Sequence, residues 1–152
     1  MNKTTIAKIL VSLILPLGIG SVAGIFTAEA IPEWYATLHR PSFNPPNWLF
    51  GPVWTILYLV MGISLFMIWK QEKSKERNFA IAALMFQLLL NFGWSFIFFY
   101  FNKIGLAFIE IILLWLSIVI MLVWFYKIKP MAAYINIPYL VWVTFASFLN
   151  GA

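Results

Sequence analysis

Residues 41–69 read PSFNPPNWLFGPVWTILYLVMGISLFMIW, a proline- and tryptophan-rich entry followed by an apolar run. Proline lacks an N–H and fixes φ, so it suits the start of a helix better than its interior. Pro52 falls inside the run, and we expect it to kink or restart the helix there. A kink frees backbone carbonyls, which membranes tolerate only where protein or a cavity covers them. The segment therefore predicts a bent helix that faces protein or a cavity, rather than a simple membrane anchor.

The whole chain shares this apolar character. Of its 152 residues, 63% are hydrophobic and 10% are charged, and the mean hydropathy is +0.91. Soluble domains are about half apolar and about a quarter charged, so we predict an integral membrane protein in a lipid bilayer. The absence of cysteine excludes disulfides and thiol catalysis, and a single histidine, His39, argues against a protein metal site. The net charge of +5 lies in short loops, where membrane topology explains it better than nucleic-acid binding does.

Five apolar runs reach the length of about 20 residues that a helix needs to cross the hydrocarbon. They cover residues 6–28, 46–69, 78–101, 105–127 and 131–151. The predicted fold is all-α, a polytopic bundle of five transmembrane helices that forms one domain over residues 1–152. The longest loop, at 29–45, carries Trp34 and Tyr35 and several prolines, and it is either an ordered lid or a plain interfacial connector.

The first run has two interpretations. Lys3 and Lys8 precede it, and the sequence AEA at 28–30 closes it like a secretory cleavage site. Its apolar stretch is longer than that of a usual signal peptide, and Gly20 and Gly24 form a GxxxG pattern that permits close helix packing. We therefore expect a retained helix, whose glycine face is one candidate interface for a second copy.

The basic residues predict an orientation. With five spans, the N-terminus and the second and fourth loops share one side of the membrane. Eight of the ten lysines and arginines lie there, and two, Arg40 and Lys103, lie on the other side. In a bacterial cell membrane, the positive-inside rule then places the N-terminus in the cytoplasm and the C-terminus outside.

Polar and aromatic residues recur at helical spacing inside the spans, where steps of three or four put side chains on one face. The sets are Gln87, Asn91 and Ser95 with Trp94 beside them; Tyr139, Trp142, Ala146 and Asn150; and Trp54 with Tyr58. At about 1.5 Å per residue, the aromatic residues and Glu110 lie roughly 8–13 Å below the outer surface. Rings and a few polar groups at one depth are typical of a small-molecule site.

Simpler interpretations stay open. An aromatic stripe can be packing alone, and Gln87 and Asn91 can hydrogen-bond neighbouring helices. Glu110 lies near the interface, where it can reach headgroups or pair with Arg40 or Lys103. Because it is a single acid at depth, it gives weak support to proton-coupled transport.

A cholesterol-type pattern occurs at residues 123–129, VWFYKIK. Such patterns are loose, and the lysines mark the end of a span better than they mark a sterol site.

These motifs resemble the translocator protein family, also called the tryptophan-rich sensory or TspO/MBR family, over about residues 18–150. The matching pieces are WYATLHRPSFNPPNW at 34–48, GPVW at 51–54, NFGW at 91–94, the acid Glu110, and PYLVWVTFA at 138–146. The resemblance implies a five-helix bundle, often a homodimer. It also implies binding of porphyrins and related tetrapyrroles such as protoporphyrin IX and haem, of sterols, and of benzodiazepine-type or isoquinoline carboxamide drugs.

The resemblance places the ligand pocket among the helices beneath the first loop. The expected lining residues are Tyr35, Pro45, Trp54, Tyr58, Trp94, Trp142 and Ala146. Asn91 is expected to orient the ligand, and the porphyrin is a ligand rather than a covalent cofactor.

We expect a membrane receptor or sensor, with two alternatives. In some bacterial relatives the positions of Trp54 and Trp142 are thought to support light-dependent breakdown of protoporphyrin IX, although no nucleophile–base pair supports ordinary enzyme chemistry. The other alternative is a porphyrin or sterol transporter, which a chain without a visible inverted repeat supports weakly.

The sequence departs from animal members of the family at its C-terminal end. Those members carry a sterol-recognition segment with a Tyr and an Arg after the last Leu-Asn pair, whereas this sequence ends at Gly151-Ala152. Sterol binding through that segment is not expected, and the missing polar tail suggests a shortened C-terminus. The abundance of Ile, Phe, Asn and Lys is typical of an AT-rich genome and suggests a bacterial source.

Overall fold

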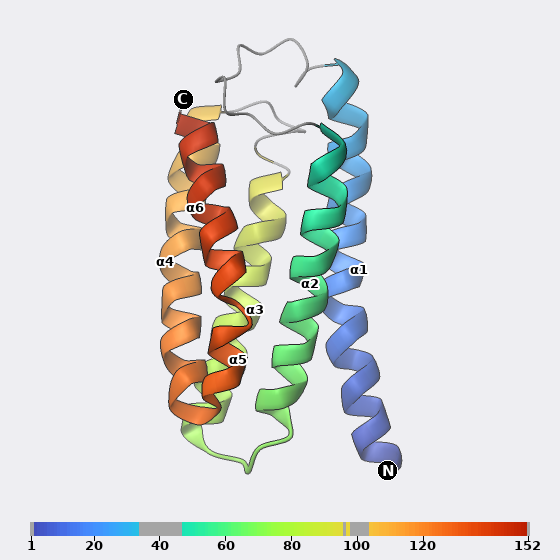
Figure 1. The fold of residues 1–152 in the computed structure, drawn as a ribbon, viewed down its shortest axis with the longest axis vertical. Coiled ribbons are helices and arrows are strands. Elements are labelled where there is room, and N and C mark those ends of the chain that lie inside the picture. Colours follow the sequence, from blue (N-terminus) through green and yellow to red (C-terminus); the bar gives the residue numbers. More distant parts are fainter. Residues whose placement is uncertain (1, 34–46, 96, 98–103, 152) are drawn as a thin grey trace.

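The computed structural model describes residues 2–33, 47–95, 97 and 104–151, which form a bundle of helices (Figure 1). The bounds of the six described helices are α1 Lys3–Glu33, α2 Asn47–Trp69, α3 Lys75–Ser95, α4 Ile104–Ile128, α5 Pro130–Tyr134 and α6 Ile137–Gly151. α1 begins at one end of the bundle, and α6 finishes at the other. Most of the predicted lid loop at 29–45 lies outside the described residues.

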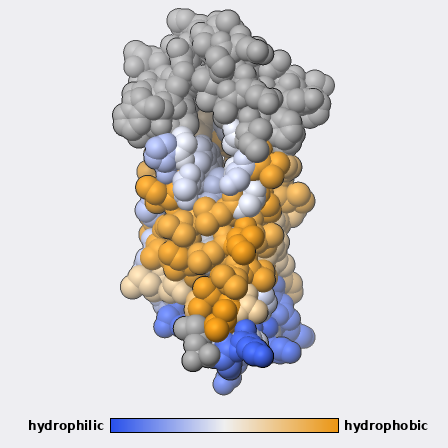
Figure 2. All heavy atoms as spheres, turned by 90° about the vertical axis from the view of Figure 1, so that its right-hand side faces the viewer, coloured by the Kyte–Doolittle hydropathy of each residue, from blue (hydrophilic) through white to orange (hydrophobic). Residues whose placement is uncertain are grey.

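The surface of the bundle is that of a membrane protein. In the described part of the chain, four helical tracts are long and apolar enough to cross a membrane: Lys3–Gly24, Gly51–Trp69, Gly105–Ile128 and Pro130–Phe148. Large apolar side chains such as Ile14, Leu89 and Val141 are more than half exposed, and Figure 2 shows a broad hydrophobic band around the middle of one face. Soluble monomers rarely expose apolar patches of this extent. The protein is therefore an all-α, polytopic membrane protein.

Two helices extend beyond the bounds that the hydropathy predicts. α1 begins at Lys3 and continues to Glu33, beyond the predicted run of residues 6–28. α3 begins at Lys75 rather than at residue 78, because the Ser74 hydroxyl accepts a hydrogen bond from the Arg77 N–H at 3.0 Å and caps the first turn. A hydropathy scan does not detect a polar first turn of this kind.

The predicted fifth helix at 131–151 is two helices, α5 and α6. Pro138 has no N–H to donate to the preceding turn, which interrupts the regular helical ladder. The ladder is also irregular at Asn136, whose N–H donates to the Ala133 carbonyl at 3.0 Å, while its Nδ2 donates to the Ala132 carbonyl at 2.8 Å. The run is apolar throughout, so hydropathy conceals the break.

α2 runs unbroken through Pro52, so the helix does not restart there. Pro52, three residues before Thr55, has no N–H to donate, and the Thr55 hydroxyl donates to the carbonyl of Gly51 at 2.8 Å. Both Gly51 and Pro52 are exposed, which places the proline on the outer side of α2.

α1 packs closely against α2 at two glycines. A Cβ built on Gly62 would stand 2.7 Å from the backbone oxygen of Ser12, and one built on Gly20 would overlap the ring of Tyr58. Gly24 has no neighbour within 4 Å of such a Cβ. Gly20 thus faces α2 of the same chain and is not available as half of a GxxxG face for a second copy.

The basic side chains that the sequence assigned to one side gather at one end of the bundle. This end holds the start of α1, the α2–α3 connection and the α4–α5 junction (Figure 1). Hydrophilic side chains collect at the same end in Figure 2. Arg77 is buried there, and its Nη1 donates to the carbonyls of Trp69 and Gln71, each at 2.9 Å. These bonds tie the start of α3 to the end of α2.

Candidate ligand-binding site

Trp54 is the centre of a cluster of aromatic rings between α2 and α6. Its ring centroid lies 5.8 Å from that of Tyr58, 6.4 Å from Tyr139 and 6.3 Å from Trp142. Phe145 extends the cluster, with its ring 5.7 Å from that of Trp142. The contacts are tilted or edge-to-face, which the ring quadrupoles favour over face-to-face stacking.

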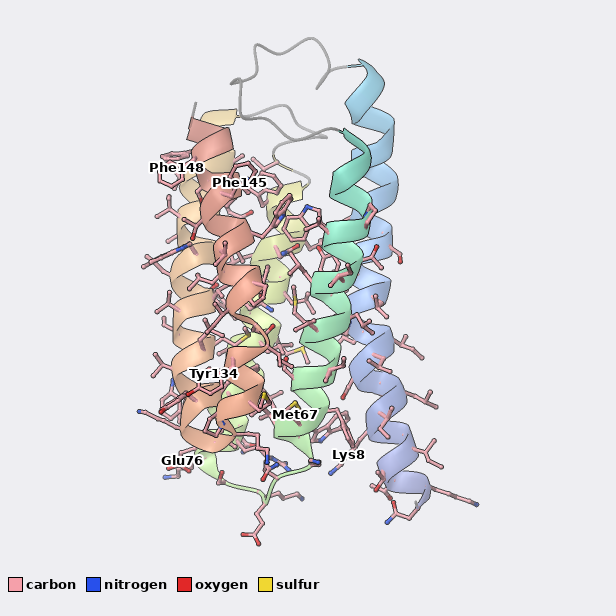
Figure 3. All side chains as sticks on the ribbon, viewed as in Figure 1. Lys8, Met67, Glu76, Tyr134, Phe145 and Phe148 are labelled. Carbon is pink, nitrogen blue, oxygen red and sulfur yellow. The ribbon has the colours of Figure 1, made fainter. Side chains whose placement is uncertain are left out.

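These rings fill space that the helix backbones leave open. The backbones of α2 and α6 are not among the closely packed helix pairs, and side chains from both helices meet between them. Tyr58 and Tyr139 are buried, whereas Trp54 and Trp142 are half-buried. Figure 3 places Phe145 toward the end of the bundle opposite the basic end. The two indoles are therefore less deeply buried than the two phenols.

A chain of buried hydrogen bonds runs beside the rings and joins three helices. The Tyr58 hydroxyl on α2 donates to Oδ1 of Asn91 on α3. Nδ2 of Asn91 donates to the hydroxyl oxygen of Tyr139 on α6 at 2.8 Å, and that hydroxyl donates to Oε1 of Gln87 at 2.6 Å. Nε2 of Gln87 completes the chain by donating to the Leu84 carbonyl at 3.0 Å.

This chain fixes the positions of the rings. Interhelical hydrogen bonds in membrane proteins contribute about 0.6 kcal/mol on average and about 1.7 kcal/mol at most. Their geometry also matters, because each bond holds the hydroxyl end of its ring at one position on α3. Tyr58 and Tyr139 are thus held against Trp54 at their rings and against α3 at their hydroxyls.

Glu110 lies on α4 at the edge of this region. Both of its carboxylate oxygens are buried, and neither has a hydrogen-bond partner among the described residues. A Cβ on Gly93 would stand 3.1 Å from its Oε2, so the missing side chain of Gly93 makes room for the carboxylate beside α3. The carboxylate therefore faces the bundle rather than the headgroups, while Arg40 and Lys103, its other predicted partners, lie outside the described residues.

The structure brings together four of the residues expected to line the site: Trp54, Tyr58, Asn91 and Trp142. Trp94 and Ala146 are each 8% exposed and belong to the same buried core. Tyr35 and Pro45 fall outside the described residues.

Tyr139 and Gln87 are central to the site but were not among the residues predicted to line it. The helical spacing already placed Gln87 one turn from Asn91 and Tyr139 one turn from Trp142. What the spacing could not give was the contact between the two helices, which depends on how α6 turns after its break from α5.

Several known proteins are similar to this chain in sequence. The sequence model of the TspO/MBR family matches residues 12–152. The tryptophan-rich protein TspO of Chlorobaculum tepidum is 39% identical over 154 residues, which cover 99% of this chain and 95% of that protein. The protein of the same name from Archaeoglobus fulgidus is 39% identical over 148 residues, covering 97% and 95%. The human translocator protein is 35% identical over 120 residues, covering 78% of this chain and 71% of that protein. The chain belongs to the TspO/MBR family.

Proposed function

We propose that this protein is a membrane receptor or sensor that binds tetrapyrroles such as protoporphyrin IX or haem at the Trp54 ring cluster. The observation that carries the proposal is the cluster itself, in which two half-buried indoles stand beside two phenols held by hydrogen bonds. A porphyrin is a wide, flat aromatic molecule, and indole faces offer it stacking and apolar contact. The name of one relative, the tryptophan-rich sensory protein of Cereibacter sphaeroides, is consistent with a sensory role.

Other flat apolar molecules are candidates for the same site. Sterols and benzodiazepine-type or isoquinoline carboxamide drugs would use the same apolar contacts, and the polar chain ending at Tyr58 would select among them. A thermal-shift comparison of protoporphyrin IX, haem, cholesterol and an isoquinoline carboxamide ranks these ligand classes. The proposal requires that a tetrapyrrole raise the unfolding temperature more than cholesterol does.

The proposed topology has five membrane crossings, with α3 as the third and the α5–α6 tract as the fifth. The basic end would face the cytoplasm of a bacterial cell, which puts the ring cluster in the outer half of the membrane. We propose a homodimer as the assembled form.

A fluorescence-quenching titration of the detergent-solubilised protein with protoporphyrin IX tests the proposed site. Trp142→Ala should weaken binding about tenfold, which corresponds to about 1.4 kcal/mol. Trp124→Ala is the matched control, because Trp124 is a half-buried tryptophan near the other end of the bundle. Equal affinities for the wild type and Trp142→Ala would remove Trp142 from the site.

Light-dependent breakdown of protoporphyrin IX is a second candidate function. It is favoured by the edge-to-face contact of Trp54 and Trp142, whose electron-rich rings would lie beside the same bound porphyrin. Illumination of the complex should then yield a new absorbing product that disappears in Trp54→Phe and Trp142→Phe. Bleaching identical to that of free porphyrin would exclude this activity and leave the binding proposal standing.

A further inference from the structure

The basic end of the bundle carries aromatic rings paired with lysines. The Nζ atom of Lys8 on α1 lies 5.6 Å from the ring centroid of Trp69, and that of Lys70 lies 5.7 Å from Phe66. The closest pair is on α4, where Nζ of Lys127 lies 4.6 Å from the ring centroid of Trp124. Figure 3 places Lys8, Glu76 and Tyr134 at this end, away from Phe145 and the ring cluster.

The Lys127 pair is part of a larger surface formed by α3 and α4. The ring of Phe79 on α3 stacks on that of Trp124, with centroids 5.5 Å apart and planes inclined by 29°. Phe79 is 57% exposed, and Trp124 is half-buried, so both rings present apolar surface outward. Lys127 follows Trp124 by one helical turn and lies next to the last residue of α4. We call Phe79, Trp124 and Lys127 the α3–α4 rim.

The height of the α3–α4 rim in the bundle matches the boundary between acyl chains and headgroups. Trp124 lies about 6 Å above the end of α4, and Phe79 lies a similar distance from the start of α3, at about 1.5 Å per residue. Tryptophan concentrates at this boundary because its ring is apolar and its N–H is polar. Lysine extends past the ring, with its stem in apolar surroundings and its ammonium in the headgroup layer.

The Lys127 ammonium is available to an external anion. In the described part of the chain it forms no ion pair, and the ring of Trp124 engages one side of the cation without consuming its N–H donors. The nearest acid along α3 is Glu76, which lies one turn before Phe79 and forms no ion pair with Lys127. A phosphodiester would supply both the negative charge and the acceptor oxygens.

We propose that the α3–α4 rim is a binding site for an anionic phospholipid, with Lys127 on the phosphate and the stacked Phe79 and Trp124 rings against the glycerol backbone and upper acyl chains. The basic end of the bundle carries seven lysines and only two acids, Glu72 and Glu76. Its net positive charge therefore complements an anionic leaflet. The stacked rings distinguish a lipid from a soluble anion, because a free phosphate has no apolar part to cover them. This assignment gives the VWFYKIK segment at 123–129 a lipid partner that is recognised by charge.

Native mass spectrometry of the delipidated, detergent-solubilised protein tests the proposal. The protein is mixed with equal amounts of phosphatidylglycerol and phosphatidylcholine, and the ratio of the two bound lipids is measured. The wild type should prefer phosphatidylglycerol, and Lys127→Gln should lower that preference about fivefold, the effect of one lysine near an anionic surface. Lys127→Arg should retain it.

Lys73→Gln is the matched control, because Lys73 is an exposed lysine in the α2–α3 connection with no ring contact among the described residues. The proposal requires Lys73→Gln to behave like the wild type. An equal loss in both glutamine variants would mean that charge alone attracts the lipid, and no preference in the wild type would mean that the site does not exist. Displacement of the bound lipid by inorganic phosphate at the same concentration would identify a site for soluble anions instead.

Discussion

The ring of Tyr58 lies directly on Gly20, so closely that a methyl group at position 20 would overlap three of its ring atoms. The same tyrosine donates its hydroxyl proton to Asn91 on α3. α1 contributes no aromatic ring to the described cluster, yet the absence of a side chain on α1 determines where one of the rings can lie. The first helix is therefore part of the site.

Replacing Gly20 on α1 by alanine should displace the ring of Tyr58 and so disturb the ring cluster between α2 and α6. The overlap includes Cγ of Tyr58, which a rotation of the ring does not move, so the ring or α1 must shift. Overpacking of this kind costs about 1 to 3 kcal/mol. Thermal unfolding in detergent should show a lower midpoint for Gly20→Ala, and porphyrin affinity should fall with it. Gly24→Ala should unfold at or slightly above the wild-type temperature, because position 24 has open space; equal effects at the two positions would contradict this account.

Removing the buried hydroxyl of Tyr139 should lower the free energy of unfolding more than removing an exposed tyrosine hydroxyl does. Tyr139→Phe leaves Oε1 of Gln87 and one N–H of Asn91 without their buried partner, at about 1 to 3 kcal/mol per orphaned group. Tyr134→Phe removes the hydroxyl of a tyrosine that is 51% exposed and should change stability by less than about 0.5 kcal/mol. Urea unfolding followed by circular dichroism measures both. A Tyr139→Phe variant as stable as Tyr134→Phe would show that the hydrogen-bond chain contributes nothing.

Leucine substitutions at Asn91 and Glu110 should change the unfolding temperature in opposite directions. Asn91 has partners on two helices, so Asn91→Leu leaves both tyrosine hydroxyls to find new ones and lowers the unfolding temperature. The carboxylate of Glu110 is buried without a partner among the described residues, so Glu110→Leu removes a desolvated polar group and should raise the unfolding temperature. A gain in stability with a loss of ligand binding would fit a residue retained for function. Destabilisation by Glu110→Leu would reveal a partner outside the described residues.

The hydrogen bonds of Arg77 should hold the α2–α3 connection in a fixed conformation that resists proteolysis. Its guanidinium donates to two carbonyls of the preceding segment, and hydrogen bonds to charged groups contribute about 1.5 to 3 kcal/mol. Arg77→Met keeps the apolar stem but loses both bonds, so trypsin should cut after Lys73 several times faster than in the wild type. Lys75→Met removes an exposed cation from the same region and should leave the rate at Lys73 unchanged.

The sequence was sufficient to predict an apolar helical bundle, because hydropathy over about twenty residues reports membrane helices directly. It also predicted that Trp54, Tyr58 and Trp142 lie at one depth, because each residue of a helix adds a fixed rise along the axis. It did not predict the break between α5 and α6, because both sides of Asn136 are equally apolar. Nor did it predict the serine cap that extends α3 to Lys75.

The direction of each side chain around its helix was harder to predict than its depth. The GxxxG pattern of Gly20 predicts close helix packing and offers a second copy as one candidate partner, whereas the structure turns Gly20 toward Tyr58 of the same chain. Glu110 was given headgroups as one partner, whereas its carboxylate turns toward Gly93. Both cases depend on the rotation of one helix against its neighbour, which arises from contacts between distant residues and not from local spacing.

In the chain of hydrogen bonds at the site, every donor points in the same direction. Each side chain donates to the next group, in the order Tyr58, Asn91, Tyr139, Gln87 and the Leu84 carbonyl. The phenolic proton of Tyr58 points to Asn91, and each later proton points further along, as far as the Leu84 carbonyl. The chain begins at the Tyr58 hydroxyl oxygen, which can therefore accept a further hydrogen bond but has no further proton to donate. A molecule that approaches Tyr58 with an N–H or O–H group can join the chain unchanged. One that approaches with a carbonyl or carboxylate needs the Tyr58 proton, which then leaves Asn91. The bonds cannot simply reverse, because the Leu84 carbonyl at the other end can only accept, and this makes the site a filter for donors.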